Sequence, residues 1–173
     1  MPHDIELEKF LKKQNDINLY EYPLNNDFAQ FKNYGTSKCK NDYIFNLDAD
    51  EFPPQYLLEN MHLIIEQNDA EVIWLPRINI VEGMTPEIAP QFGFQLNEQG
   101  WINFPDNQQR CYKNDFPRIH WINKVHERLT GYKTHAFLPH DIETAEHLAI
   151  KHIKTLERQI QQNQKYAEIM KGK

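Results

Sequence analysis

Residues 43–47 form a short, mostly apolar segment that runs directly into three carboxylates, Asp48, Asp50 and Glu51. The segment is rich in residues that favour β-structure and polar residues flank it, which is typical of a short buried strand. In an open α/β sheet, ligands bind beyond the carboxyl ends of the strands. The sequence therefore predicts a buried strand that carries an acidic turn into a ligand site.

The segments on either side alternate between helical and strand patterns. Helices are expected at residues 5–13, 28–38, 55–66 and 145–170, the last of them continuous or broken. Strands are expected at residues 17–22, 72–75, 101–104, 109–112 and 119–122. Residues between 82 and 100 are rich in Gly, Pro and Gln and indicate a long loop, a feature that is often functional. The alternation predicts an α/β fold with a mixed, mostly parallel sheet whose central strands are 43–47 and 72–75.

Composition limits the class of protein. A length of 173 residues suits a single domain over 1–173 with a C-terminal helical segment at about 145–170, and 40% hydrophobic with 25% charged residues is ordinary for a soluble domain. The net charge of −6 argues against a nucleic-acid binder, which needs a positive surface. No apolar run is long enough to span a bilayer and the first residues lack a signal-peptide pattern, so a cytoplasmic protein is expected. Cys39 and Cys111 are expected to be reduced, with Cys111 buried.

The three carboxylates suggest a cation. Carboxylates crowded at a strand end repel one another unless a cation lies among them. Mg²⁺ and Mn²⁺ prefer oxygen ligands and keep coordination positions for substrate phosphate. A metal that bridges Asp48, Asp50 and a diphosphate would stabilise a diphosphate leaving group. The alternative is a solvated acidic loop without chemistry, and the apolar strand directly before the turn favours the metal site.

Three motifs carry a resemblance to a known family. Residues 28–33 and 41–51, which read FAQFKN and NDYIFNLDADE, resemble family 2 glycosyltransferases of the GT-A fold, a Rossmann-like fold in which an Arg-Asn helix precedes the Asp-x-Asp strand. Residues 101–110 and 121–127 are similar to two segments of lipopolysaccharide-core-type members. The motifs occur in the family's order, and the resemblance covers most of the chain.

The resemblance implies a metal-dependent, hexosyltransferase-like enzyme. Such an enzyme moves a sugar from a nucleotide-diphosphate sugar, here a UDP-sugar, to the hydroxyl of a glycan or of a lipid-linked sugar. Mn²⁺ or Mg²⁺ would be bound by Asp48 and Asp50, and Asp48 would also contact the donor. His126 is the first choice for a further metal ligand, and His152 is the second.

The resemblance also implies roles on both sides of the reacting bond. Asp106 would be the general base, and an apolar wall from Trp101 and Phe104 is expected to raise its pKa. Trp101 would stack on a sugar, or else lie in the core. Arg110 would clamp phosphate or orient Asp106, or else form a structural salt bridge. Lys32 stands where the family often has an Arg that contacts the diphosphate.

The beginning of the chain departs from the family pattern. Members start with a strand, a helix and a second strand that grip the nucleotide base, whereas residues 2–6 fit the helix that follows such a unit. We therefore expect a minimal or truncated GT-A fold with an incomplete base pocket. A natural minimal form, a shortened chain and a degenerate gene are the open alternatives. The sheet edge left by missing strands would favour pairing between copies, so a homo-oligomer is expected.

Two other function classes compete with the transferase. A phosphatase-like enzyme with Asp48 as nucleophile also places Asp-x-Asp after a buried strand, but it usually has Thr or Val where this chain has Phe52. A non-catalytic module derived from a glycosyltransferase would hold metal, nucleotide or a partner. Covalent phosphorylation of Asp48 would select the phosphatase, and transfer from a nucleotide sugar would separate the enzyme from the binding module.

Overall fold

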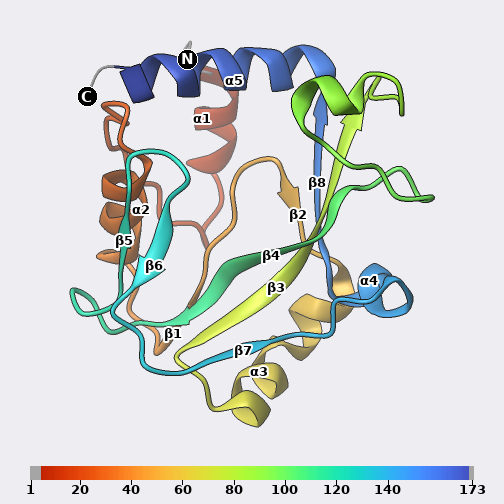
Figure 1. Ribbon diagram of the computed structural model, residues 1–173. Helices are drawn as coiled ribbons and strands as arrows, with labels where there is room; N and C mark the ends of the chain where they lie inside the picture. The colour runs from red at the N-terminus through yellow and green to blue at the C-terminus, as the bar shows by residue number, and fades with distance from the viewer. Residues whose placement is uncertain (1–4, 172–173) are drawn as a thin grey trace.

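The computed structural model describes residues 5–171, which form a curled mixed sheet with helices around it (Figure 1). The helices are α1 (Ile5–Leu11), α2 (Phe28–Thr36), α3 (Gln55–Asn68), α4 (Ile142–Leu148) and α5 (Leu156–Lys171), with a 3-10 turn at Ala89–Phe92. The main sheet has the order β1 (Tyr43–Phe45), β4 (Ile102–Lys113), β3 (Val72–Glu82), β8 (Ile150–Thr155), β2 (Glu51–Phe52), and β7 (His135–Phe137) also pairs with β3. A small second sheet joins β5 (His120–Ile122) to β6 (Arg128–Thr130).

The pairing directions correct one expectation about the sheet. The expected α/β class with a mixed sheet is confirmed, but the sheet is not mostly parallel. The pairs β1–β4, β3–β4 and β2–β8 are antiparallel, and only β3–β8 and β3–β7 are parallel. The strand β3 is central as expected, whereas β1 lies at the edge because, among residues 5–171, β4 is its single neighbour.

Two expected elements are also wrong. Residues 17–22 form no strand. Ile17 and Tyr20 are 43% and 51% exposed, so burial of these side chains does not stabilise a strand here. The helix expected over residues 145–170 is interrupted by β8. Along β8 the buried Ile150 and His152 alternate with less buried neighbours, the period of a strand, and pairing with β3 overrides the helical pattern. The two strand pieces expected at 101–104 and 109–112 belong to one long strand, β4.

The helix α2 is fixed by its sequence at both its start and its buried face. Asp27 caps it by accepting a hydrogen bond from the Gln30 amide at 2.9 Å. The side chain of Asn33 donates to the Trp121 carbonyl and accepts from the Trp121 amide, at 2.9 and 2.8 Å. These bonds dock α2 on β5 and hold the adjacent Lys32 in a buried position, with 9% of its surface exposed.

The core is divided among three groups of buried residues. One lies under α2 around Val72 and Tyr112, one lies between α3 and the sheet around Leu57 and Ile73, and one lies beside α4 around Ile78. Both cysteines are free, with Cys111 buried as expected. No helix within residues 5–171 has the length and apolar character needed to cross a membrane.

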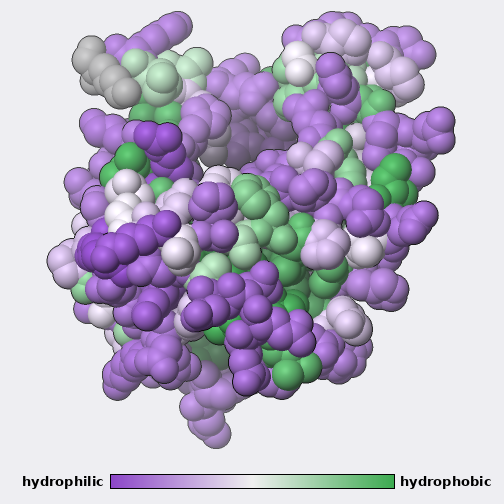
Figure 2. All heavy atoms as spheres, turned by 60° about the horizontal axis from the view of Figure 1, so that its bottom comes forward, coloured by the Kyte–Doolittle hydropathy of each residue, from purple (hydrophilic) through white to green (hydrophobic). Residues whose placement is uncertain are grey.

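The surface differs between the middle of the molecule and one of its ends. Both chain ends lie at the end of the molecule where α5 runs (Figure 1). On the face shown in Figure 2, hydrophobic residues gather near the middle and polar residues surround them. The same view shows a hollow near the top of the molecule.

Candidate active site

The candidate site is built on pairs of residues opposite each other on neighbouring strands. Glu51 on β2 lies opposite His152 on β8, and His152 lies opposite Asn79 on β3. Arg77, two residues before Asn79, lies opposite Asp106 on β4. Opposite residues on paired strands share a face of the sheet and contact each other. Four strands thus place these five polar side chains together.

The Asp-x-Asp turn is closed by its own backbone. The Asp48 amide donates to the Glu51 carboxylate at 3.0 Å, and the Glu51 amide donates to the Asp48 carbonyl at 3.1 Å. Before the turn, the Asn46 amide donates to the Arg110 carbonyl at 2.8 Å and extends the pairing of β1 with β4. The Glu51 side chain is completely buried. These hydrogen bonds therefore fix the backbone of the turn that carries Asp48 and Asp50.

Asp48 is held by two cations. Its carboxylate lies 2.6 Å from Nη2 of Arg110 and 3.3 Å from Nζ of Lys32, and the same Lys32 lies 2.6 Å from Glu127. Burial alone would raise the pKa of Asp48, but the charges of Arg110 and Lys32 outweigh it and lower the pKa below its ordinary value. Arg110 also bonds Glu51. Of the alternatives for Arg110, the structure therefore shows the salt bridge, and it is made with the acidic turn rather than with Asp106.

A β-bulge directs Arg110 toward the acidic turn. The register of β3 and β4 passes from Ile73–Cys111 to Trp74–Gln109, so Arg110 has no opposite residue on β3. Bulges of this kind change the direction of a side chain and are common beside active sites. The guanidinium is 3% exposed and reaches two carboxylates of the turn.

Asp106 is saturated with hydrogen bonds. One carboxylate oxygen, Oδ2, accepts from Nε and Nη2 of Arg77 at 3.0 and 2.7 Å and from the Asn79 amide group at 2.8 Å, while Oδ1 accepts from Gln108 at 2.6 Å. Burial alone would raise the pKa of Asp106, but the Arg77 charge and these donors lower it. The expected rise in this pKa is therefore wrong, because cationic and amide donors rather than an apolar wall contact the carboxylate.

Trp101 lies in the core rather than beside an open site. It is 8% exposed, belongs to the buried group around Ile78, and packs edge-on against Phe104 with ring centres 4.9 Å apart. The core alternative for this residue thus agrees with its position. Neither ring is placed to shield Asp106 from its polar donors.

Asp50 has a looser environment than Asp48. Its Oδ2 lies 3.5 Å from Nε2 of His152 and 3.5 Å from Nη2 of Arg158 on α5. The other ring nitrogen of His152, Nδ1, lies 2.9 Å from the Asn79 side-chain oxygen. Burial and then the charges of Arg77 and Lys154 lower the pKa of His152, which favours a neutral imidazole at pH 7. The second-choice histidine therefore lies beside the Asp-x-Asp motif.

His126, the first choice as a metal ligand, contacts Tyr166 of α5 rather than the Asp-x-Asp motif. It is exposed, has a left-handed backbone with φ of 53°, and meets the Tyr166 ring edge-on with centres 5.5 Å apart. It makes no hydrogen bond or ion pair with Asp48 or Asp50 in the described part of the chain. Residues 5–171 contain no group of three or more His, Cys, Asp or Glu side chains arranged to hold a metal ion.

Three site residues were missed from the sequence, namely Arg77, Asn79 and Arg158. The strand from Val72 was expected to end at residue 75, yet β3 continues to Glu82. The available signal was the polar–apolar alternation of residues 77–80. Arg158 was missed because the strand β8 before α5 was not recognised.

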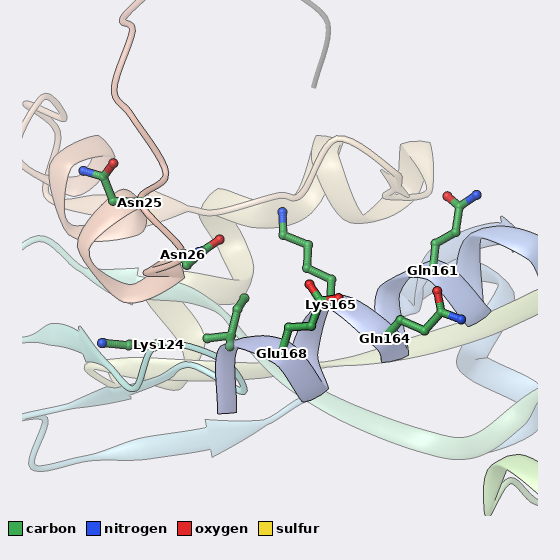
Figure 3. A pocket seen from close by; sticks show the side chains of 8 residues that line it. Asn25, Asn26, Lys124, Gln161, Gln164, Lys165 and Glu168 are labelled. Atoms are coloured by element: carbon green, nitrogen blue, oxygen red, sulfur yellow. The ribbon is translucent and has the colours of Figure 1, made fainter. Parts of the chain in front are cut away.

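An open groove lies apart from these residues. It has a volume of about 550 Å³ and runs between α5 and the turn before α2 (Figure 3). Its lining is mainly amide and charged, and consists of Asn25, Asn26, Lys124, Gln161, Gln164, Lys165, Glu168 and Ile169. The groove contains none of the site residues predicted from the sequence.

Comparison with known proteins identifies a family. The family model described as "Glycosyl transferase family 2" matches residues 6–124. This match covers more than half of the chain and includes the acidic turn, Arg77, Asn79 and Asp106, whereas β8 and α5 follow it. No curated protein matches the chain.

Proposed function

The chain belongs to glycosyl transferase family 2, and on that basis we propose that it transfers a sugar from a UDP-sugar to the hydroxyl of a glycan or of a lipid-linked sugar, with Mn²⁺ or Mg²⁺ as cofactor. Family membership makes the protein a glycosyltransferase of the nucleotide-sugar type. The choice of UDP, the need for a metal and the acceptor are parts of the proposal. Family membership also leaves the phosphatase-like alternative without support.

The observation that carries the proposal is the pair formed by Asp50 and His152. Asp48 is occupied by Arg110 and Lys32, whereas Asp50 Oδ2 and His152 Nε2 lie 3.5 Å apart and neither has a strong bond of its own. Mg²⁺ and related ions are commonly bound by one or two carboxylates together with substrate phosphates. A site of two residues therefore fits a metal that binds together with the diphosphate. Asp48 would be a further ligand if the metal displaces Arg110 and Lys32 from it. When bound, the metal neutralises charge on the leaving diphosphate.

Two cations beside Asp50 suit the same diphosphate. Arg158 lies 3.5 Å from Asp50. Lys154 donates a hydrogen bond to Gln162 at 2.8 Å, and its pKa is lowered by burial and then by the charge of Arg77. Arginine matches phosphate oxygens with paired donors, and lysine acts as a point charge. A metal at Asp50 would release Arg158 to bind phosphate. The leaving group would then meet positive charge from the metal and from α5.

Asp106 stays the candidate base by resemblance, but its contacts favour a positioning role. A carboxylate that accepts four hydrogen bonds and has a lowered pKa is a weak base. If Asp106 is the base, Asp106→Asn loses ~10²–10⁴-fold in kcat while the protein stays folded. Near-normal turnover of the folded variant assigns the base elsewhere.

The function is tested by binding and turnover on one sample. A panel of nucleotide sugars is screened by thermal shift with and without Mn²⁺, and sugar transfer or donor hydrolysis is then measured. We expect a UDP-sugar with Mn²⁺ to raise Tm more than either alone, because both bind only the folded state. Binding without turnover would support the non-catalytic module instead. A folded protein that no nucleotide sugar stabilises would contradict the proposal.

A further inference from the structure

We propose that Asn79 is a positioning residue that fixes the tautomer and the direction of His152, so that His152 presents a lone pair to the metal beside Asp50. The inference rests on the proposed function for the identity of the metal. The contacts themselves do not depend on it. They form a chain from Asp106 through Asn79 to His152 and Asp50, with all neighbouring atoms 2.8–3.5 Å apart.

The direction of the Asn79 side chain follows from its carboxylate partner. An ionised carboxylate only accepts hydrogen bonds, so the group that contacts Asp106 Oδ2 at 2.8 Å is the Asn79 amide nitrogen. The Asn79 oxygen then faces His152 Nδ1 at 2.9 Å. An amide oxygen only accepts, so Nδ1 must carry the hydrogen. In a neutral imidazole the lone pair is then on Nε2, which faces Asp50.

The sheet makes this arrangement rigid. Asn79 and His152 are opposite residues of the parallel pair β3–β8, so backbone hydrogen bonds rather than a loop set their separation. Asp106 is in turn held by Arg77 and Gln108, and it cannot turn away from Asn79 without breaking those bonds. The hydrogen bonds that make Asp106 a weak base also hold it in place, so that it fixes the side-chain amide of Asn79.

The result is a pair of acceptors that calls for a cation. His152 Nε2 and Asp50 Oδ2 both present lone pairs at a separation of 3.5 Å. Arg158 supplies a cation to the same oxygen at 3.5 Å in the absence of metal. A histidine ligand normally donates its second nitrogen to an outer partner, and loss of that partner typically weakens metal binding 10–100-fold. Asn79 is that outer partner here.

The test has two readouts, of which one does not involve metal. The ¹⁵N chemical shifts of the histidine rings report the tautomer in metal-free protein, and His152→Gln assigns the signals. We expect His152 to have its hydrogen on Nδ1 in the wild type. Asn79→Leu should mix the tautomers and weaken Mn²⁺ binding in the presence of UDP about 10–100-fold. Asn60→Leu on α3, whose side chain donates to the Tyr56 carbonyl within its own helix, is the matched control.

The outcomes separate this inference from the proposed function. A hydrogen on Nε2 in the wild type, or an unchanged tautomer in folded Asn79→Leu, would overturn the role of Asn79. If Asn79→Leu does not fold, Asp106→Asn replaces it, since a neutral amide at 106 lets the Asn79 amide flip and should also mix the tautomers. Absence of Mn²⁺–UDP binding by wild type with the expected tautomer would count against the metal-dependent function alone.

Discussion

Asp48 and Asp50 are two residues apart, yet their carboxylates have different surroundings. Asp48 contacts Arg110 at 2.6 Å and Lys32 at 3.3 Å, whereas both partners of Asp50 lie at 3.5 Å. The same motif therefore combines a residue that holds the fold with a residue that is available to a ligand. This division cannot be read from the spacing Asp-x-Asp, because it depends on which cations the distant strands bring to each side chain.

We predict that neutralising Asp48 affects mainly stability and that neutralising Asp50 affects mainly metal binding. Asp48→Asn should lower the free energy of unfolding by about 1–2 kcal/mol, because it removes a charged partner of the buried Arg110 while Asp48 itself is partly exposed. Asp50→Asn should leave stability nearly unchanged and weaken Mn²⁺ binding with UDP at least tenfold. Urea unfolding and calorimetry on both variants measure this. Equal metal binding by wild type and Asp50→Asn would refute the assignment.

At the scale of elements, the sequence predicted the parts of the site that are local. The strand before Asp48 and the helix that carries Lys32 were both recognised, because each is a short pattern with a clear start and end. The strand that carries Asp106 was expected only as two separate pieces on either side of it. The strand β8 was missed because α4 ends at Leu148 and α5 begins at Leu156 without a Gly or Pro between them. Pairing with β3 and β2 makes residues 150–155 a strand, and pairing is not visible in one sequence.

The helix α5 leads to a prediction about competition for Asp50. Arg158→Gln should raise the affinity for Mn²⁺ without nucleotide about two- to fivefold, since it removes a largely exposed cation whose ion pair contributes up to ~1 kcal/mol. With UDP present the gain should disappear, because the same guanidinium then binds phosphate. Titration of free Mn²⁺ by electron paramagnetic resonance measures both affinities. Arg128→Gln is the control, and equal effects of both variants would show a general charge effect.

At the scale of the whole molecule, alternating charges connect the sheet to its helices. Lys32 of α2 joins Asp48 to Glu127, Arg110 of β4 joins Asp48 to Glu51, and Arg77 of β3 joins Glu51 to Asp106. Arg158 joins α5 to the same acidic turn. The carboxylates of Asp48 and Asp106 have lowered pKa values for this reason. Much of the cohesion at this end of the sheet is therefore electrostatic.

The network predicts how acid affects stability. A carboxyl group whose pKa is lower in the folded than in the unfolded chain stabilises the fold above its ordinary pKa of 3.8, and this stabilisation is lost as the pH falls through the folded value. Arg77→Met removes the cation, and burial then raises the pKa of Asp106. We expect this variant to be about 3–5 kcal/mol less stable than wild type at neutral pH.

The difference between the two proteins should shrink in acid. Urea unfolding at neutral pH and at about pH 3, below the unfolded carboxyl pKa, measures it. A difference independent of pH would show that Arg77 acts through packing alone. Arg128→Met, which removes an exposed arginine, controls for the loss of a positive charge from the molecule as a whole.

Among the residues of α5, Gln159 is the only one that is buried. A helix with so little buried surface separates from its domain at a much smaller free energy than the sheet does. Amide hydrogens of α5 should therefore exchange with solvent far sooner than those of β3, and the carboxylate of Asp50 should lose its Arg158 partner in each such event. Local opening of α5 would thus release Asp50 to a charged ligand while the strands that shape the site stay paired.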